Sequence, residues 1–190
     1  KFQPITGLPL AAGFLAPSLE WVKRHEPGVY ARTRLVLTPK DYIRYRLTGT
    51  LDTEPTDATG TYLLDISSRQ WSKEVLQGLG FSADMLPRIE DSMSIGGHVT
   101  STAAKETGLR EGLPVARGGS DQAMAALALN LDRGGVVAVA LSTGATTITA
   151  VDSPVSDARI HTLCHTRDQT WLAMGATLTG GVGLSWLRDV

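Results

Sequence analysis

The sequence contains a single cysteine, Cys164, and few aromatic residues, at 6% of the chain. One cysteine cannot form an internal disulfide, so a reducing, cytoplasmic location is expected. No apolar run approaches the roughly 18 residues of a membrane span, and the first residues do not begin a signal peptide. The formal net charge of -1 excludes broad electrostatic attraction to nucleic acid or to an anionic membrane.

What is present is ordinary globular composition, with 190 residues that are 42% hydrophobic and 19% charged. Such a chain can bury a core and can form one large domain or parts of two. The sequence does not begin with Met, which favours a segment of a longer protein, incomplete at both ends. Helical and mixed segments come first and a sheet-rich part follows, so the predicted class is α/β with two lobes.

Glycine and proline punctuate the first part of the chain. Helices are predicted at about 16–25, 38–48, 72–79 and 100–107, with a short strand at 34–37. Pro27-Gly28 is expected to stop the first helix, and the other three end at a glycine. Thr38 is predicted to cap the second helix, with Asp41 in the position of a capping-box acid.

The second part of the chain is richer in β-branched residues. A strand is predicted at 113–117 and an Ala-rich, buried helix at 121–130, followed by a polar break at 132–135 that is the expected interdomain hinge. Strands are predicted at 136–141 and 146–151, joined as a hairpin, and at 160–165 and 170–175. A further helix opens at Gly180-Gly181.

The first chemical motif is the turn Gly118-Gly119-Ser120 leading into Asp121 and Gln122. Glycines allow a sharp turn and a close approach of substrate, and a helix N-terminus stabilises the Asp121 anion. Such a carboxylate can accept the proton of a hydroxyl that attacks phosphorus. The alternative is that Asp121 only caps the helix. A nucleophilic Ser120 is disfavoured, because the nucleophile-elbow pattern requires glycine where Gln122 stands.

The second motif is the predicted hairpin tip Ser142-Thr143-Gly144-Ala145. Small hydroxylated residues around a glycine expose N–H and O–H donors and suit a phosphate, although many plain hairpins have such tips. The turn at 180–183 is also compatible with an anion, but it matches neither the dinucleotide pattern nor a Walker loop.

A metal site is the less favoured interpretation of His161, Cys164 and His165. Residues four apart on a strand share a face, so Cys164 would point away from the two histidines. No second ligand pair is evident, and a structural role is expected for all three.

Taken together, these motifs resemble the FGGY carbohydrate kinases, the family of xylulokinase, glycerol kinase and gluconokinase. The resemblance spans nearly the whole chain. Its markers, in order, are Gly13 to Trp21, Leu37 to Tyr42, Leu47-Thr48-Gly49, Thr53-Glu54, Asp57-Ala58, Asp65, Trp71, Met85-Leu86-Pro87, Gly118 to Gln122, Ser142-Thr143-Gly144, Gly180-Gly181 and Ser185-Trp186-Leu187.

The resemblance implies the actin-like, ribonuclease H-like fold, with sugar and Mg²⁺-ATP bound between two α/β lobes. It implies that residues 1–131 are the end of the first, sugar-binding lobe and residues 132–190 the start of the second, nucleotide-binding lobe. It further implies a catalytic base, sugar ligands and nucleotide contacts, and no metal ligand from this segment. The implied catalytic base is Asp121, and the implied sugar ligands are Gln122, Gly13 and Phe14. The implied nucleotide contacts are Ser142, Thr143, Gly144, Gly180, Gly181 and Ser185.

Three positions depart from the family pattern. Ser18 stands where lysine is usual and Leu15 where a small hydroxylated residue is usual, while Gln122 follows the Asp as in glycerol kinase. The segment from Gly13 to Gly49 resembles xylulokinase most, so D-xylulose is the expected substrate. The alternative substrates are another ketose, a polyol or glycerol, and the alternative function is non-catalytic sugar binding. A homodimer is left open as the oligomeric state. The family's Asp-x-Gly-Thr phosphate loop and adenine site have no counterpart here, so residues 1–190 alone are expected to be inactive.

Overall fold

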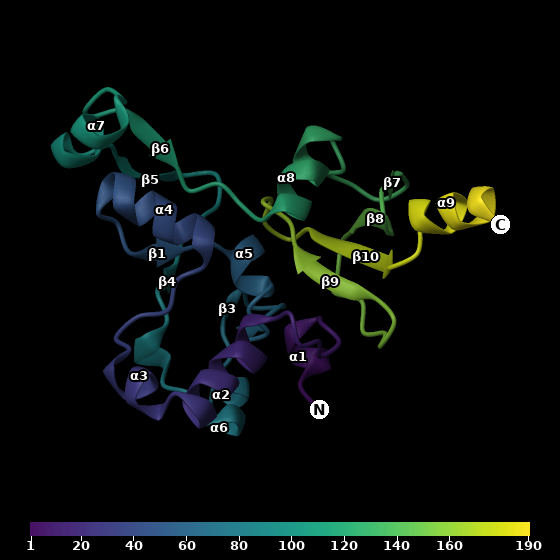
Figure 1. Ribbon diagram of the computed structural model, residues 1–190, viewed down its shortest axis with the longest axis horizontal. Coiled ribbons are helices and arrows are strands. Elements are labelled where there is room, and N and C mark those ends of the chain that lie inside the picture. Colours follow the sequence, from purple (N-terminus) through teal and green to yellow (C-terminus); the bar gives the residue numbers. More distant parts are fainter.

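The computed structural model describes residues 1–190, a mixed α/β arrangement in which one sheet stands beside a group of short helices (Figure 1). The helices are α1 (Gln3–Thr6), α2 (Leu15–His25), α3 (Pro27–Arg32), α4 (Pro39–Thr48), α5 (Pro55–Thr59), α6 (Lys73–Leu79), the 3₁₀ turn η1 (Ala83–Met85), α7 (Ser101–Thr107), α8 (Asp121–Ala128) and α9 (Gly181–Asp189). The strands are β1 (Asp52–Thr53), β2 (Leu64–Asp65), β3 (Gln70–Trp71), β4 (Arg88–Ile89), β5 (Ile95–His98), β6 (Pro114–Ala116), β7 (Val137–Leu141), β8 (Ala145–Val151), β9 (His161–Cys164) and β10 (Trp171–Thr177). None of the helices has the length and apolarity to cross a bilayer.

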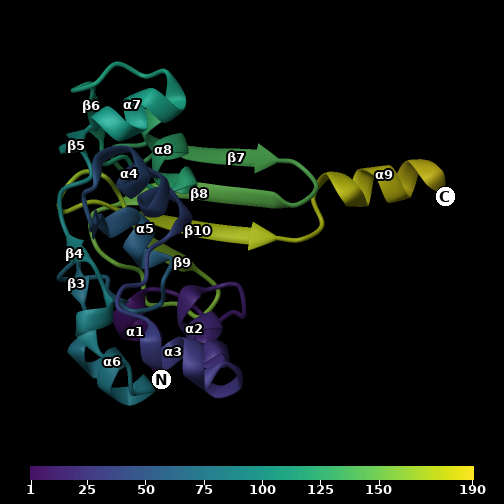
Figure 2. The ribbon, with the colours of Figure 1, turned by 60° about the vertical axis from the view of Figure 1, so that its left-hand side comes forward.

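The main sheet has the strand order β7-β8-β10-β9, with every neighbouring pair antiparallel. Strands β7 and β8 form the predicted hairpin, in which Leu141 pairs with Ala145. Figure 2 shows β7, β8 and β10 side by side, with α9 projecting beyond the end of the sheet. The remaining strands form three separate two-stranded pairs, β1-β4, β2-β3 and β5-β6.

Helix α8 is packed on the main sheet. Its small residues Ala123 and Ala126 lie in one buried cluster with Ile148, Ala150 and Leu172. Alanine at these positions lets the helix backbone approach the sheet closely, and each apolar side chain removed from water contributes to stability. The residue that begins α8, Asp121, is therefore carried by a helix fixed to the sheet.

The sheet is also joined to the earlier part of the chain. A second buried cluster contains Ala58, Leu64 and Ile66 from the first part together with Cys164 and Trp171 from the sheet. A larger cluster lies among the N-terminal helices and is made of Leu8, Ala16, Leu19, Tyr62, Leu63, Val75, Leu76, Phe81 and Leu86. The two parts of the sequence thus share a core across β9 and β10.

Most local predictions are confirmed. Helices α2, α4, α6 and α7 lie where the patterns predict them, and the last three end at a left-handed glycine. These glycines are Gly49, Gly80 and Gly108, with φ of 76°, 65° and 77°, a conformation that costs glycine little. The predicted strand before Gly118 and the four strands of the sheet are also present.

Three local predictions are wrong. Residues 34–37 form no strand, because their only backbone bond to another segment runs from the Val36 N–H to the Met85 carbonyl and no continuous partner exists. The predicted stop of α2 before Pro27 is confirmed, and Pro27 in addition begins α3 at the first helical position, where proline is favoured. The Thr38 hydroxyl accepts no backbone N–H and instead donates to Asp41 and Asp57. Helix α8 is buried on one face only, since Leu127 remains exposed.

Candidate active site

The turn before α8 presents Asp121 without using it as a cap. Gly118 takes a left-handed conformation, with φ of 74°, and Ser120 occupies the cap position. The Ser120 hydroxyl accepts the Ala123 N–H at 3.4 Å. Because Ser120 caps the helix, Asp121 is the first helical residue and is free of the capping role that the sequence left open.

The Asp121 carboxylate is exposed and accepts hydrogen bonds only from its neighbour Gln122. Oδ1 accepts the Gln122 N–H at 2.7 Å, and Oδ2 lies 3.5 Å from Gln122 Nε2. The free N–H groups at the N-terminus of α8 place partial positive charge beside this carboxylate. Chemically, this arrangement offers an accessible anion that can take a proton from a hydroxyl group placed beside it.

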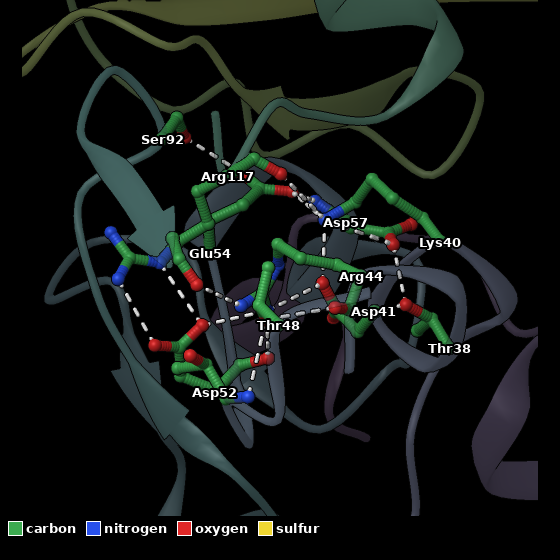
Figure 3. A network of polar contacts seen from close by, with 12 residues as sticks. Thr38, Lys40, Asp41, Arg44, Thr48, Asp52, Glu54, Asp57, Ser92 and Arg117 are labelled. Carbon is green, nitrogen blue, oxygen red and sulfur yellow. Dashed lines mark hydrogen bonds and ion pairs between the residues drawn. The ribbon is translucent and has the colours of Figure 1, made fainter. Parts of the chain in front are cut away.

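A buried ionic network, drawn in Figure 3, includes Arg117, the residue directly before this turn. Arg117 donates through Nε and Nη2 to the two carboxylate oxygens of Asp52, at 3.0 Å each. Asp52 also pairs with Arg44 at 2.6 Å, and Arg44 pairs with Asp41 at 3.2 Å. Two-point pairing of a guanidinium with a carboxylate fixes direction as well as distance. The backbone immediately before Gly118 is therefore firmly held.

The same network continues through Lys40 and Glu54. Lys40 Nζ lies 2.7 Å from Asp41, 3.5 Å from Glu54 and 3.8 Å from Asp57. Burial alone would raise the pKa of Asp41, but hydrogen bonds from Lys40, Thr53 and Arg44 outweigh it and lower that pKa. Burial raises the pKa of Asp57 above its ordinary value despite the Thr38 hydroxyl 2.6 Å away.

The structure joins the two predicted nucleotide segments. The N–H of Gly180 donates to the Thr143 carbonyl at 3.0 Å, and that of Gly181 to the Ser142 carbonyl at 2.6 Å. A Cβ at Gly180 would lie 2.3 Å from the Gly144 oxygen, and one at Gly181 would lie 2.4 Å from the Ser142 oxygen. Only glycine permits this approach, so the hairpin tip and the start of α9 form one unit.

This contact changes which donors can meet an anion. The first N–H groups of α9 are directed at the carbonyls of the hairpin tip, so the turn at 180–183 is not an open anion site of its own in this arrangement. The N–H groups of Thr143 and Gly144 donate to no protein group, and the exposed Thr143 hydroxyl makes no hydrogen bond. Ser185 lies exposed on α9, one turn beyond Gly181.

Gly13 and Phe14 have different surroundings. Gly13 lines a hollow of about 280 Å³ together with Thr38, Asp57 and Thr61. The half-buried Phe14 ring stacks on Tyr62, at 6.2 Å between centroids, and meets His161 edge-on. No hydrogen bond joins Gly13 or Phe14 to Asp121, or Asp121 to the hairpin tip, so the structure brings together only Asp121 with Gln122 and the hairpin tip with Gly180 and Gly181.

His161 is partly buried, and Cys164 and His165 are fully buried. Burial raises the pKa of the Cys164 thiol to about 11 and lowers the pKa of both histidines. His165 lies just beyond β9, fully buried, and its Nδ1 accepts the Arg167 N–H at 3.0 Å. No group of three or more His, Cys, Asp or Glu side chains is placed to hold a metal ion.

Several residues that shape the site were not assigned a role from the sequence. In the sequence, Thr53-Glu54 and Asp57-Ala58 are only markers of the family resemblance. No sequence pattern pointed to a role for Asp52 or Arg117. The available signal is the density of acids between Asp52 and Asp57, which is unusual for a segment that turns out to be buried.

Comparison with known proteins defines the class. The chain superimposes on the crystal structure of xylulose kinase from Rhodospirillum rubrum with a TM-score of 0.91 and 28% identity, covering 98% of this chain and 38% of that one. The fold is therefore that of the actin-like sugar kinases.

Sequence comparison gives the family. The model of the N-terminal domain of the FGGY family of carbohydrate kinases matches residues 1–128. Xylulose kinase of Bacillus subtilis is 34% identical over 178 residues, 93% of this chain and 36% of that protein, and xylulose kinase of Escherichia coli is 34% identical over 184 residues, 96% and 38%. This chain belongs to the FGGY family of carbohydrate kinases, and it spans less than two fifths of the length of these relatives.

Proposed function

We propose that this protein transfers the terminal phosphoryl group of ATP to a sugar hydroxyl, with D-xylulose converted to D-xylulose 5-phosphate. The observation that carries the proposal is the exposed Asp121 carboxylate at the start of α8, in a turn whose cap is supplied by Ser120. The xylulose kinases among its relatives support the choice of sugar. Another ketose, a polyol or glycerol is the alternative substrate.

In this mechanism Asp121 accepts the proton of the reacting sugar hydroxyl as its oxygen attacks phosphorus. Gln122 is beside it and has a side-chain amide that can hydrogen-bond a neighbouring sugar hydroxyl. Gly13, which lines the hollow with Thr38 and Asp57, and Phe14 are proposed to lie toward the sugar. The role of the ionic network is to hold the start of the turn through Arg117.

The hairpin tip fits the phosphates of ATP. Thr143 and Gly144 offer unused N–H donors, Thr143 adds a hydroxyl, and no bulky side chain covers them. Gly180, Gly181 and Ser185 are proposed to contact the nucleotide beside this tip. Mg²⁺ bound to nucleotide phosphates keeps several waters and needs few protein carboxylates, so it does not require a group of acidic ligands at the hairpin tip. ATP supplies the phosphoryl group and Mg²⁺ neutralises its charge.

We also propose that residues 1–131 belong to the sugar-binding lobe and residues 132–190 to the nucleotide-binding lobe, with the hinge at 132–135. Packing of Ala123 and Ala126 on the sheet indicates that the two parts meet at α8. A cytoplasmic location is proposed because the only cysteine is a free, buried thiol.

The test is Asp121→Asn in the full-length protein, assayed by coupled ADP release with Mg²⁺-ATP against D-xylulose, other ketoses, polyols and glycerol. Loss of general-base assistance should lower kcat by roughly 100-fold or more while circular dichroism and the melting temperature stay near those of the wild type. A correctly folded variant with near-normal turnover would exclude Asp121 as the base. Sugar binding by a wild-type protein that releases no ADP with any member of the panel would favour the non-catalytic alternative.

A further inference from the structure

The turn that carries Asp121 is fixed by a side chain that lies far away in the sequence. The N–H of Ser120 donates to Thr56 Oγ1 at 2.8 Å, across 64 residues. Gly119 lies directly over the same hydroxyl, since a Cβ built there would be 2.8 Å from Thr56 Oγ1. Thr56 is 2% exposed, so water cannot readily replace it as the acceptor.

Thr56 is itself held at the first turn of α5. Its own N–H donates to Glu54 Oε2 at 2.7 Å. Glu54 is completely buried and also accepts the N–H of Asp57 at 2.9 Å and the hydroxyl of Ser92 at 2.7 Å. A carboxylate satisfied by several donors in a buried site is rigid, and this rigidity extends to the position of the Thr56 hydroxyl.

Two other contacts hold the ends of the turn. At its far end the Ser120 carbonyl accepts the Met124 N–H at 2.9 Å, which joins the turn to α8, and at its near end lies Arg117. Arg117 is bound to Asp52, but Gly118 and Gly119 separate it from Ser120. Gly118 has open space where a side chain would be, and glycine backbone is conformationally permissive. Arg117 alone therefore leaves the direction of the Gly119–Ser120 peptide unfixed, and the bond to Thr56 fixes that peptide between the glycines and the start of α8.

We propose that Thr56 is a positioning residue that holds the Gly118–Asp121 turn so that the Asp121 carboxylate meets the reacting hydroxyl. The inference rests on the proposed function of Asp121 as the base. A displacement of about 1 Å in a reacting group can cost on the order of 100-fold in rate, so loss of this single hydrogen bond is expected to lower kcat by roughly 10- to 100-fold.

The experiment compares three variants of the full-length protein. Thr56→Val removes the acceptor at nearly constant volume, and Thr56→Ser retains it. Thr59→Val is the matched control, because Thr59 lies on the same helix, is completely buried and bonds to Pro55 and Cys164 rather than to the turn. Melting temperatures test whether the two valine variants lose comparable stability.

Turnover is measured with Mg²⁺-ATP and the sugar of the panel that the wild type uses fastest. We expect Thr56→Val to lower kcat with little change in the KM for ATP, while Thr56→Ser restores kcat and Thr59→Val leaves it within about twofold of the wild type. Amide hydrogen exchange gives a second readout that does not depend on activity. The Ser120 N–H should lose protection in Thr56→Val and keep it in Thr56→Ser.

Asp121→Asn and the double variant separate this inference from the proposed function. If Asp121→Asn is slow and Thr56→Val slows it no further, Thr56 acts through Asp121. If Asp121→Asn is slow but Thr56→Val is normal, or the two losses multiply, Asp121 remains the base and positioning by Thr56 is refuted. Near-normal turnover of Asp121→Asn overturns both. An equal loss of kcat in Thr59→Val, or unchanged Ser120 exchange in Thr56→Val, also refutes the positioning role.

Discussion

Replacing Asp52 by Asn should test how strongly the buried network holds the fold. The Asp52 side chain is 3% exposed and lies between two guanidinium groups, those of Arg117 and Arg44. The substitution keeps the size of the side chain but removes its charge, and it replaces one oxygen by an amide nitrogen that donates. Arg117 then loses its one ion-pair partner, while Arg44 keeps only Asp41.

The magnitude follows from this geometry. Removing one partner of a buried ion pair typically costs 3–5 kcal/mol, because the remaining charge is left without compensation. The free energy of unfolding is therefore expected to fall by about 3–5 kcal/mol. Since Arg117 directly precedes the Gly118 turn, kcat should fall as well.

The assay is denaturant-induced unfolding of the full-length protein, followed by circular dichroism, with Asp168→Asn as the control. Asp168 also pairs with an arginine, Arg69, at 3.3 Å, but its side chain is 94% exposed. An exposed pair contributes at most about 1 kcal/mol. If Asp52→Asn destabilised the protein no more than Asp168→Asn, the reasoning about the buried network would be refuted.

Three further predictions concern single side chains. Thr143→Val should weaken ATP use, in rate or KM, with sugar binding in the absence of ATP unchanged; if kinetic and binding measurements showed the reverse, the hairpin tip would be assigned to the wrong ligand. Cys164, whose pKa is raised by burial to about 11, should resist iodoacetamide at pH 8 until the protein unfolds, and rapid labelling of the native protein would contradict this. Burial raises the pKa of Asp57, so its folded carboxyl holds a proton more tightly than the unfolded one, and its contribution to stability is lost as the pH rises through the folded pKa. Asp57→Asn should therefore raise the melting temperature at pH 7 and lose that advantage below about pH 3.8, whereas a destabilised variant at pH 7 would show that the charged form is favoured.

Much of the fold could be predicted from local patterns. Helices α4, α6 and α7 end at Gly49, Gly80 and Gly108 because a left-handed residue terminates a helix, and glycine adopts that conformation at little cost. The β7–β8 hairpin follows from β-branched runs on either side of a small-residue tip. Patterns failed at residues 34–37, where a strand-like composition has no partner strand.

For the candidate site, too, local patterns predict some features and miss others. The glycine turn, the acid at the start of α8 and the small donors of the hairpin tip could be predicted from local patterns, because turn geometry and helix starts depend on neighbouring residues. Three contacts became visible only in the folded chain: Gly180 and Gly181 close against the hairpin tip, Asp52 lies between two arginines, and Thr56 holds the amide of Ser120. Apart from Asp52 and Arg44, which are 8 positions apart, these contacts join residues 37 to 65 positions apart. Such pairs are selected by the packing of the whole chain around its buried polar groups, which no local pattern records.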